Sequence, residues 1–308
     1  MANVPEKIEN ATIVITGASS GFGRGAAIEL GKRGANVVVA ARRTNLLEEV
    51  VAEIKENGGE ATAVTTDVSV QDDIQNLART AIEQYGRMDV WVNNVGVGAI
   101  GYFWDIPLDV HARVTDVNLK GLIYGAHAAL NQFIKQGGGT LVNVGSIDSE
   151  VPLALQNTYA ATKAAVLSLS RSLNEELRLS GHGENISVAT IMPWAVDTPW
   201  WTHAANYTGH APRMAAMDDP ALVVEEIIKA CTDPREEMPV GPKARASDIS
   251  HHLFPDFVER MTATLSKQES QKGMKAEHTT GTLFEPMQAG NTIEGGIRER
   301  MEKEDRQD

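Results

Sequence analysis

The chain has 308 residues, of which 42% are hydrophobic and 22% are charged, and its formal net charge is −13. This composition is typical of a folded globular protein and is too apolar for general disorder. The acidic balance argues against a nucleic-acid partner, because binding phosphates needs a clustered basic surface. The length predicts one large core with an appendage rather than two full domains.

The cysteine content and the apolar runs bear on the cellular compartment. The single cysteine, Cys231, cannot form an intrachain disulfide, which fits a reducing compartment. We expect it to be a small buried side chain rather than a catalytic thiol. The start of the chain has no apolar stretch of signal-peptide length, and no run approaches the roughly 20 apolar residues that span a bilayer. We therefore expect a cytoplasmic protein with no membrane partner.

Short β-branched runs alternate with longer helical patterns, which is typical of repeated βαβ units and a mostly parallel sheet. The predicted strands span residues 12–16, 36–41, 62–66, 89–93, 140–144 and 187–191, and the predicted helices span residues 22–33, 44–57, 71–85, 107–135, 157–180 and 220–232. The strand runs are apolar throughout, so helices should cover both faces of the sheet. The sequence thus predicts an α/β, doubly wound, Rossmann-type fold, with one domain over residues 1–244.

The character of the chain changes after Gly241, where it becomes more polar. Residues 245–308 hold too few large apolar side chains for a second core, so we expect a partly docked C-terminal extension. Apolar clusters at 253–254 and 283–287 should anchor it to the core or to a neighbouring subunit. Residues 266–281 should cross the surface, and the end from Glu299 onward should be mobile. A wholly disordered tail is the alternative.

The first predicted strand is followed directly by the segment TGASSGFG, which covers Thr16–Gly23, and then by a helical pattern. Glycines let the backbone turn tightly and approach a pyrophosphate, whose charge the free amides of a helix N-terminus can hold. This context favours a dinucleotide site over a merely structural turn. The candidate cofactor residues in this segment are Gly17, Ser19, Ser20, Gly21, Phe22 and Gly23.

The second predicted strand ends in Ala41-Arg42-Arg43. An acidic residue about 20 residues past such glycines would bind the adenosine ribose hydroxyls of NAD, and Ala41 occupies that place. The two adjacent guanidinium groups would instead give a 2′-phosphate charge-assisted donors. The pattern therefore favours NADP(H) over NAD. Two solvated arginines are the alternative, more so for Arg43 than for Arg42.

Tyr159 and Lys163 lie four residues apart in a helical pattern, so both project from the same face. A lysine ammonium near a phenol favours the phenolate and lowers the tyrosine pKa toward the range of proton transfer. A Tyr–Lys pair at this spacing also arises by chance, so alone it is weak evidence.

Further motifs accompany this pair. They are, in chain order, Thr16–Gly23, Asp67-Val68, Asn93-Asn94-Val95-Gly96, Asn118, Ser146, Tyr159 with Lys163, and Pro193–Thr198. With this set, residues 8–242 resemble the short-chain dehydrogenase/reductase family. The resemblance implies a dinucleotide-binding and catalytic domain that interconverts a ketone or aldehyde and a secondary alcohol, with hydride transfer to or from NADP(H).

The resemblance also implies a role for each catalytic residue. Tyr159 would be the general acid in reduction and the base in oxidation. Lys163 would lower the pKa of Tyr159 and hold the nicotinamide ribose. Ser146 would donate a hydrogen bond to the substrate oxygen, and Asn118 would anchor a water in the proton relay behind Lys163.

The remaining implied cofactor contacts are Asp67 and Val68 at the adenine, Asn94 and Gly96 on the ribose side, and Pro193, Val196 and Thr198 in the segment that reaches the nicotinamide carboxamide. Two residues depart from the family's pattern. Val95 stands where alanine is usual, a small change of volume that should be tolerated. Trp194 stands where glycine is usual, and we expect its ring to narrow the nicotinamide end of the cleft.

Residues 197–217 fall where the family has a mobile substrate lid. Trp200, Trp201, Met214 and Met217 would either wall an apolar substrate pocket or pack on the protein itself. Asp148 could reach the substrate or cap local backbone, and we expect a cap. The 8 histidines show no metal-ligand spacing, so we expect no metal.

Two functions are consistent with these features. The first is an NADP(H)-dependent oxidoreductase with a small, apolar carbonyl or alcohol substrate. The second is an NADP(H)-binding regulatory protein without turnover, since a fold alone never establishes a function. The complete set of Asn118, Ser146, Tyr159 and Lys163 favours the enzyme. The predicted helices at 107–135 and 157–180 resemble the family's dimer-forming pair, so we expect a homodimer or homotetramer.

Overall fold

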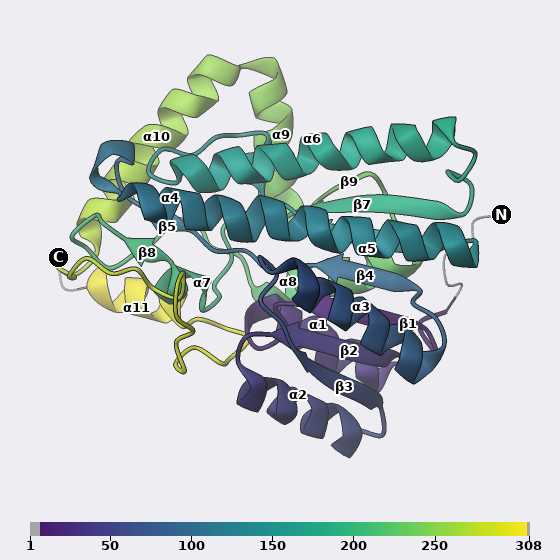
Figure 1. The fold of residues 1–308 in the computed structure, drawn as a ribbon. Helices are drawn as coiled ribbons and strands as arrows, with labels where there is room; N and C mark the ends of the chain where they lie inside the picture. The colour runs from purple at the N-terminus through teal and green to yellow at the C-terminus, as the bar shows by residue number, and fades with distance from the viewer. Residues whose placement is uncertain (1–6, 307–308) are drawn as a thin grey trace.

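The structure is a computed structural model that describes residues 7–306. Its centre is a parallel sheet with the strand order β3-β2-β1-β4-β6-β7-β9 (Figure 1). The strands are β1 Thr12–Thr16, β2 Asn36–Ala41, β3 Glu60–Thr65, β4 Val90–Asn93, β6 Gly139–Val144, β7 Ile186–Met192 and β9 Glu237–Pro239. The chain builds outward from β1 to β3 and then returns to the other side of β1 with β4. This order confirms the predicted doubly wound α/β fold.

Helices cover both faces of the sheet, as the uniformly apolar strands require. The helices are α1 Gly21–Lys32, α2 Thr44–Glu56, α3 Gln71–Tyr85, α4 Leu108–Thr115, α5 Gly121–Gln136, α6 Asn157–Leu179 and α8 Pro220–Thr232. Buried side chains of α1, α2 and α8 pack on one face. Those of α3, α5 and α6 pack on the other. The two resulting cores hold the strand ends rigidly in place.

The segment expected to be one helix over 107–135 is interrupted. Between α4 and α5, residues Asp116–Lys120 form a π-helical turn that contains Asn118. Such turns insert an extra residue into a helix and occur often at functional sites. The helical pattern alone could not predict it, because the apolar spacing on both sides continues.

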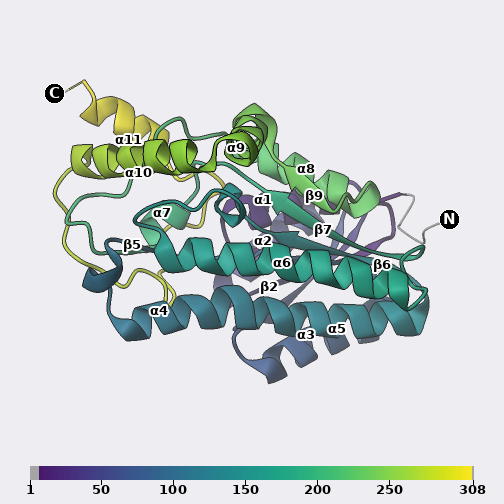
Figure 2. The ribbon, with the colours of Figure 1, turned by 90° about the horizontal axis from the view of Figure 1, so that it is seen from above.

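The C-terminal extension forms the helices α9 Gly241–Leu253, α10 Pro255–Lys272 and α11 Ile297–Glu304, and α10 and α11 lie side by side in both views (Figure 2). The expected anchor at 253–254 is wrong, because Leu253 and Phe254 are 66% and 64% exposed. The expected anchor at 283–287 begins with Leu283, which is 1% exposed.

Two further expectations for the extension differ from the structure in whole or in part. Residues 266–272 belong to α10 and bury Ser266 and Glu269, whereas residues 274–281 lie at the surface as expected. The charged end, expected to be mobile, forms α11, and Glu304 in it is buried. Glu304 pairs with Arg300 and with Arg213, and Arg213 also pairs with Glu269 and Asp305. A buried arginine needs such carboxylates, and this requirement orders the end of the chain.

The segment between β7 and α8 lies against this extension. It includes α7 Trp200–His203 and strand β8 Ala205–Asn206, which pairs with β5 Ala99–Ile100. Single antiparallel bridges join Asn206 to Thr279 and His210 to Lys275. The expected lid is therefore held by the extension. None of the helices in residues 7–306 has both the length and the apolar character needed to cross a bilayer.

Candidate active site

A tight turn joins β1 to α1 at the carboxyl edge of the sheet, where the strand order reverses. Gly17 has a φ of +72°, a conformation that favours glycine. A Cβ atom at Gly23 would lie 2.3 Å from Nδ2 of Asn94, so only glycine fits there. Nδ2 of Asn94 donates to the carbonyl oxygen of Thr16 at 2.9 Å. Asn94 thus ties the end of β4 to the turn and keeps the turn in shape.

A cavity opens above this turn, in the crevice where doubly wound folds bind dinucleotides. Of the predicted cofactor residues, it is lined by Gly17, Ser19, Ser20, Gly21, Phe22, Gly23, Arg42, Arg43, Asp67, Val68, Asn94, Gly96 and Thr198. Pro193 and Val196 line a second cavity instead. The first cavity has glycines where a pyrophosphate would approach the backbone and a helix N-terminus to hold its charge. These residues fit a nicotinamide dinucleotide.

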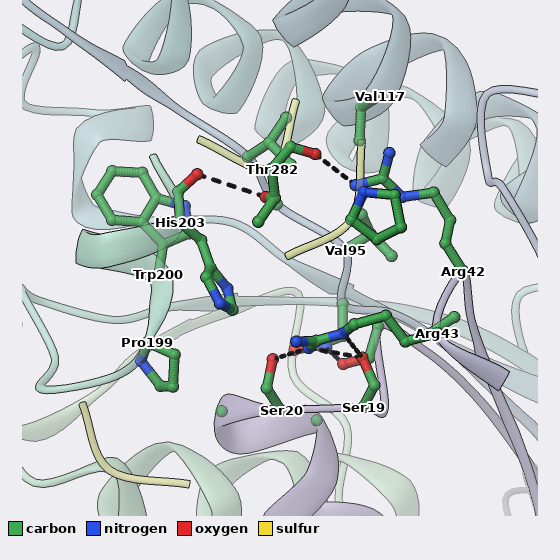
Figure 3. A pocket seen from close by; sticks show the side chains of 18 of the residues that line it. Ser19, Ser20, Arg42, Arg43, Val95, Val117, Pro199, Trp200, His203 and Thr282 are labelled. Carbon is green, nitrogen blue, oxygen red and sulfur yellow. Dashed lines mark hydrogen bonds between the residues drawn. The ribbon is translucent and has the colours of Figure 1, made fainter. Parts of the chain in front are cut away.

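The two arginines after β2 point into this cavity (Figure 3). Arg43 is 8% exposed and donates to the hydroxyls of Ser19 and Ser20 at 2.9 and 2.8 Å. Arg42 donates to the carbonyl oxygen of Thr282 at 2.5 Å. The alternative of two solvated arginines therefore does not hold. Both guanidinium groups are buried enough to need partners, and both lie beside the glycine turn.

The extension supplies several of those partners. Arg42 also donates to the carbonyl oxygen of Phe284 at 3.2 Å, and Arg43 donates to that of Met287 at 3.0 Å. The side chains of Thr282, Pro286 and Met287 line the cavity. The extension thus forms one wall of the dinucleotide cavity. Sequence reasoning missed this wall, because backbone carbonyl oxygens carry no residue signature.

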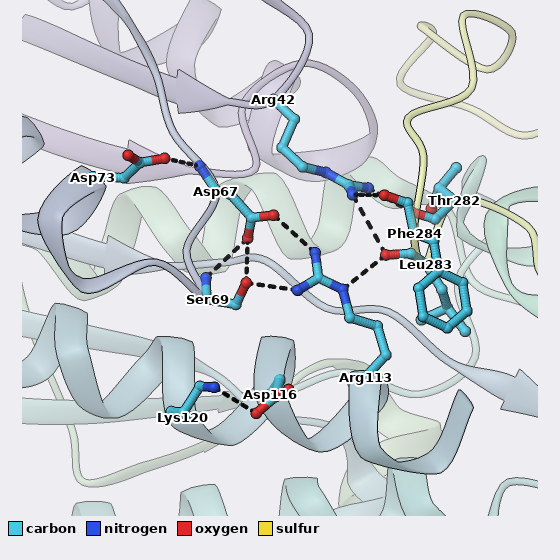
Figure 4. A network of polar contacts seen from close by, with 10 residues as sticks. All are labelled: Arg42, Asp67, Ser69, Asp73, Arg113, Asp116, Lys120, Thr282, Leu283 and Phe284. Atoms are coloured by element: carbon cyan, nitrogen blue, oxygen red, sulfur yellow. Dashed lines mark hydrogen bonds and ion pairs between the residues drawn. The ribbon is translucent and has the colours of Figure 1, made fainter. Parts of the chain in front are cut away.

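Asp67 is held in a network that reaches the same wall (Figure 4). Its carboxylate accepts from Arg113 at 2.8 Å and from the Ser69 hydroxyl at 2.6 Å. Arg113 also donates to the carbonyl oxygen of Leu283 at 2.9 Å. Burial acts to raise the pKa of Asp67, but the hydrogen bonds from Ser69 and Arg113 outweigh it and lower that pKa. Asp67 is thus a fixed anion at the edge of the cavity, and Arg113 is a site residue that the sequence did not reveal.

The second cavity holds the predicted catalytic hydroxyls. It is lined by Phe22, Gly145, Ser146, Ile147, Asp148, Leu153, Gln156, Tyr159, Pro193, Trp194, Ala195, Val196, Thr198, Trp200, Trp201 and Met214. Phe22, Thr198 and Trp200 line both cavities, so the two share a wall. Of the four residues expected to wall a substrate pocket, Met217 alone does not line this cavity, and it is buried in the same apolar cluster as Trp201 and Met214. A molecule here would lie between the hydroxyls and the dinucleotide cavity.

Tyr159 lies on α6 between an aromatic ring and a lysine. Its ring centroid is 5.1 Å from that of Trp200, and Nζ of Lys163 lies 5.7 Å from it. Burial raises the pKa of Tyr159 well above its ordinary value, the charge of Asp148 adds to this, and a hydrogen bond with Ser146 opposes it. The expected lowering of the Tyr159 pKa by Lys163 is not seen.

Lys163 is 2% exposed and donates to the carbonyl oxygen of Val144 at 2.6 Å. Burial lowers its pKa to about 8, while Asp148 acts to raise it. A Cβ atom at Gly96 would lie 3.4 Å from Nζ, and Gly96 lines the dinucleotide cavity. The ammonium therefore lies directly behind Gly96 in the wall of that cavity.

Asn118 lies in the π-helical turn below this lysine. Its amide donates to the carbonyl oxygen of Val97 at 2.8 Å and accepts from the Val97 N–H at 2.9 Å. It also donates to the Thr162 hydroxyl at 3.1 Å. Asn118 thus joins α6 to the loop after β4, and it fixes the loop that carries Gly96.

Asp148 differs from the expectation that it caps local backbone. The Ser146 hydroxyl accepts the Asp148 N–H at 3.1 Å, so Ser146 is the capping residue. Among residues 7–306, no protein group forms a hydrogen bond or ion pair with the Asp148 carboxyl, which faces the second cavity. Burial raises its pKa to about 7, while Lys163 acts to lower it.

Metal ligands were not expected, and the described residues contain no group of three or more His, Cys, Asp or Glu side chains placed to hold a metal ion. Cys231 is buried in α8, where burial raises its thiol pKa to about 12. A neutral thiol of this kind is a weak nucleophile.

Comparisons with known proteins agree with this geometry. The family model for short chain dehydrogenase matches residues 11–207. An uncharacterized oxidoreductase, YxnA, of Bacillus subtilis is 36% identical over 83% of this chain and 72% of its own length. A diacetyl reductase [(S)-acetoin forming] of Staphylococcus epidermidis is 32% identical over 78% of this chain and 88% of its own.

A solved short-chain dehydrogenase/reductase from Burkholderia phymatum, in complex with NAD, superposes with a TM-score of 0.72. It is 25% identical, and the match covers 82% of this chain and 96% of that one. The fold and these matches define an oxidoreductase that acts on CH–OH groups. The chain belongs to the short-chain dehydrogenase family.

Proposed function

We propose that this protein is an NADP(H)-dependent oxidoreductase that interconverts a small ketone or aldehyde and an alcohol, with Tyr159 as general acid and base. One observation carries the proposal. Ser146 and Tyr159 line a cavity that shares a wall with the dinucleotide cavity, and Nζ of Lys163 lies 5.7 Å from the centroid of the Tyr159 ring. A carbonyl group bound there would meet two hydroxyl donors on one side and the cofactor on the other.

The cofactor and the protein side chains contribute different steps of the reaction. A bound reduced nicotinamide supplies the hydride. The hydroxyls of Ser146 and Tyr159 hold the carbonyl oxygen, and Tyr159 donates the proton that the oxygen needs. Lys163 holds the nicotinamide ribose and, as a cation, favours the phenolate that remains. Asn118 fixes the loop with Gly96 and anchors the proton relay. In oxidation, Tyr159 takes the proton back.

The preference for NADP(H) rests on Arg42 and Arg43. Both guanidinium groups line the adenosine side of the cavity, and Ala41 offers no carboxylate to the ribose hydroxyls. Charge-assisted hydrogen bonds to a 2′-phosphate are stronger than those to the neutral carbonyl oxygens that the arginines now hold. A 2′-phosphate would therefore displace those carbonyls from Arg42 and Arg43.

Two regions of the chain have different roles in the proposed reaction. Residues 1–244 bind the cofactor and carry out the reaction, and residues 245–308 dock on that domain and close its adenosine side. The subunits would form a homodimer or homotetramer through α5 and α6. A regulatory NADP(H)-binding protein is the competing function, and the pairing of Ser146 with Tyr159 in one cavity favours the enzyme.

The test is a screen of ketones, aldehydes and secondary alcohols with both cofactors, followed by absorbance of the reduced nicotinamide. Turnover with at least one class, and a higher kcat/KM with NADPH than with NADH, would support the proposal. Binding of NADPH without turnover on any class would favour the regulatory protein instead.

A further inference from the structure

Besides the indole N–H groups of Trp194 and Trp200, two polar side chains in the wall of the substrate cavity lack protein partners. Asp148 is 6% exposed and Gln156 is 8% exposed. Both line the cavity that contains Ser146 and Tyr159. In the described part of the chain, neither the Asp148 carboxyl nor the Gln156 side-chain amide forms a hydrogen bond with another protein group.

The polar atoms of both side chains are open to the cavity rather than sealed inside the protein. They are therefore available to a ligand that offers hydrogen bonds, whereas apolar side chains of similar size would offer none. The same wall also contains several apolar side chains, including Leu153, Trp201 and Met214. Two unpartnered polar groups in this wall therefore indicate that the ligand itself supplies their hydrogen bonds.

Both side chains are fixed next to the catalytic hydroxyls. Asp148 lies in the 3-10 turn Ile147–Ser149, and the Ser146 hydroxyl accepts its N–H. Gln156 is the N-cap residue of α6, and its carbonyl oxygen accepts the N–H of Ala160 at 2.8 Å. It precedes Tyr159 by about one helical turn. A substrate whose carbonyl oxygen meets Ser146 and Tyr159 thus has its neighbouring atoms near both groups.

We propose that the substrate carries a hydroxyl group on the carbon next to the reacting carbonyl, and that Asp148 and Gln156 are the specificity residues that bind this hydroxyl. The inference rests on the proposed function, since it names the substrate class of the same site. The substrates are then α-hydroxy ketones and the corresponding vicinal diols. This replaces the expectation of a purely apolar substrate, which would leave both side chains unpaired.

The chemistry favours a hydroxyl over other polar groups. A hydroxyl both donates and accepts, so it can pair with a carboxylate, with a carboxylic acid and with an amide. The pKa of Asp148, about 7, means that both forms of this carboxyl occur near neutral pH. A second ketone only accepts, and it would leave the carboxylate form unpaired.

The experiment compares two ketones of the same shape, 3-hydroxy-2-butanone and 3-methyl-2-butanone, in which a methyl group replaces the hydroxyl. We expect the wild-type enzyme to favour the hydroxy ketone in kcat/KM by about tenfold or more, because a site built for a hydroxyl rejects an analogue that lacks it. Asp148→Leu should remove most of this preference, and the readout is the ratio of the two kcat/KM values, because the charge of Asp148 also acts on Tyr159 and Lys163 and its loss affects both ketones alike. Asp148→Asn keeps the hydrogen-bonding groups and should keep most of the preference.

A matched control is Asp105→Leu, which changes an exposed aspartate outside both cavities and should change neither ketone's kinetics. If Asp148→Leu does not fold, as judged by its thermal transition, Gln156→Leu makes the same test from the other side of the hydroxyl. Equal kcat/KM values for the two ketones in the wild type, or equal losses for both in the variants, would overturn the inference.

A binding measurement separates this inference from the proposed function. Tyr159→Phe with bound NADPH should bind the hydroxy ketone more tightly than the methyl ketone, and quenching of the cavity tryptophans reports both Kd values. Failure of the wild type to reduce either ketone, or any other carbonyl compound, would refute the oxidoreductase. Equal Kd values in the Tyr159→Phe complex would refute recognition by Asp148 and Gln156, whatever the turnover.

Discussion

At the scale of single residues, Tyr159 is the side chain on which the proposed reaction depends. Replacing it with phenylalanine removes the proton donor and keeps the ring that packs on Trp200. We expect turnover to fall by about a hundredfold or more, the usual contribution of general acid catalysis. NADPH affinity, measured by fluorescence titration, should change little. Turnover near the wild-type level would remove Tyr159 from the proposed mechanism.

Arg42 and its neighbour Ala41 give a second test at this scale. The double change Ala41→Asp with Arg42→Ile supplies a carboxylate for the ribose hydroxyls and removes a donor to the 2′-phosphate. The ratio of kcat/KM for NADPH to that for NADH should fall by about tenfold or more. Arg79→Ile is a suitable control, because Arg79 is exposed and pairs only with its own helix. An unchanged ratio would contradict the assigned cofactor preference.

Trp194 replaces the small residue usual at this position, and its ring lines the substrate cavity. Trp194→Gly should widen the cavity, so that ketones with bulkier substituents gain in kcat/KM relative to 2-butanone while the Kd for NADPH stays within about threefold. A substrate profile identical to the wild type, in a variant with a normal thermal transition, would show that this ring does not limit access.

At the scale of elements, the sequence predicted correctly those strands and turns that depend on neighbouring residues alone. The strands are apolar runs bounded by turns, and β1, β2 and the turn at Gly17 followed from that pattern alone. The cofactor wall of the extension could not be predicted in this way. Arg42 meets Thr282 through a backbone carbonyl oxygen, a contact that any residue at position 282 could make.

The polar cavity wall shows the same limit. The sequence placed Asp148 beside Ser146, and a short-range cap was the expected role. Ser146 is the capping residue instead. Whether another group pairs with the Asp148 carboxyl depends on elements that are distant in the sequence, so the local pattern could not predict it. The π-helical turn at Asn118 was hidden for a related reason, because its apolar spacing matches that of a continuous helix.

Helix α11 gives a prediction about the extension. Deleting residues 299–308 removes Glu304 and Asp305, and Arg213, whose side chain is 2% exposed, then keeps only Glu269. Removing a partner from a buried ion pair costs about 3–5 kcal/mol. We therefore expect Tm to fall by roughly 5 °C or more. A mobile end from Glu299 onward, as the sequence predicts, would instead leave Tm unchanged.

The control for this deletion keeps the carboxylates. A chain that ends at Asp305 retains all three carboxylate partners of Arg213 and should have the same Tm as the full-length protein. In an Arg213→Met background, deletion of residues 299–308 should cost much less than in the wild type, because the buried charge is gone. Equal costs in both backgrounds would show that α11 stabilises the protein by other contacts.

At the scale of the whole molecule, α5 and α6 lie side by side on one face of the protein (Figure 1). The outer face of α5 exposes Ile123 and Ile134, at 43% and 45%. The outer face of α6 exposes the small residues Ala161 and Ala164, which would let a second helix approach closely. Apolar and small side chains together suit a two-fold interface, in which the same face of both subunits meets.

We therefore expect the particle mass in light scattering to be two or four times the 33.2 kDa of one chain. Ala164→Glu places a charge in the middle of the proposed interface, and it should lower that mass by half or more while leaving the protein folded. Leu253→Glu is the matched control, because Leu253 is also exposed to solvent but lies on α9, away from this face. If Leu253→Glu dissociates the particle and Ala164→Glu does not, the subunits meet through the extension. A wild-type mass of one chain would mean that α5 and α6 form no stable interface.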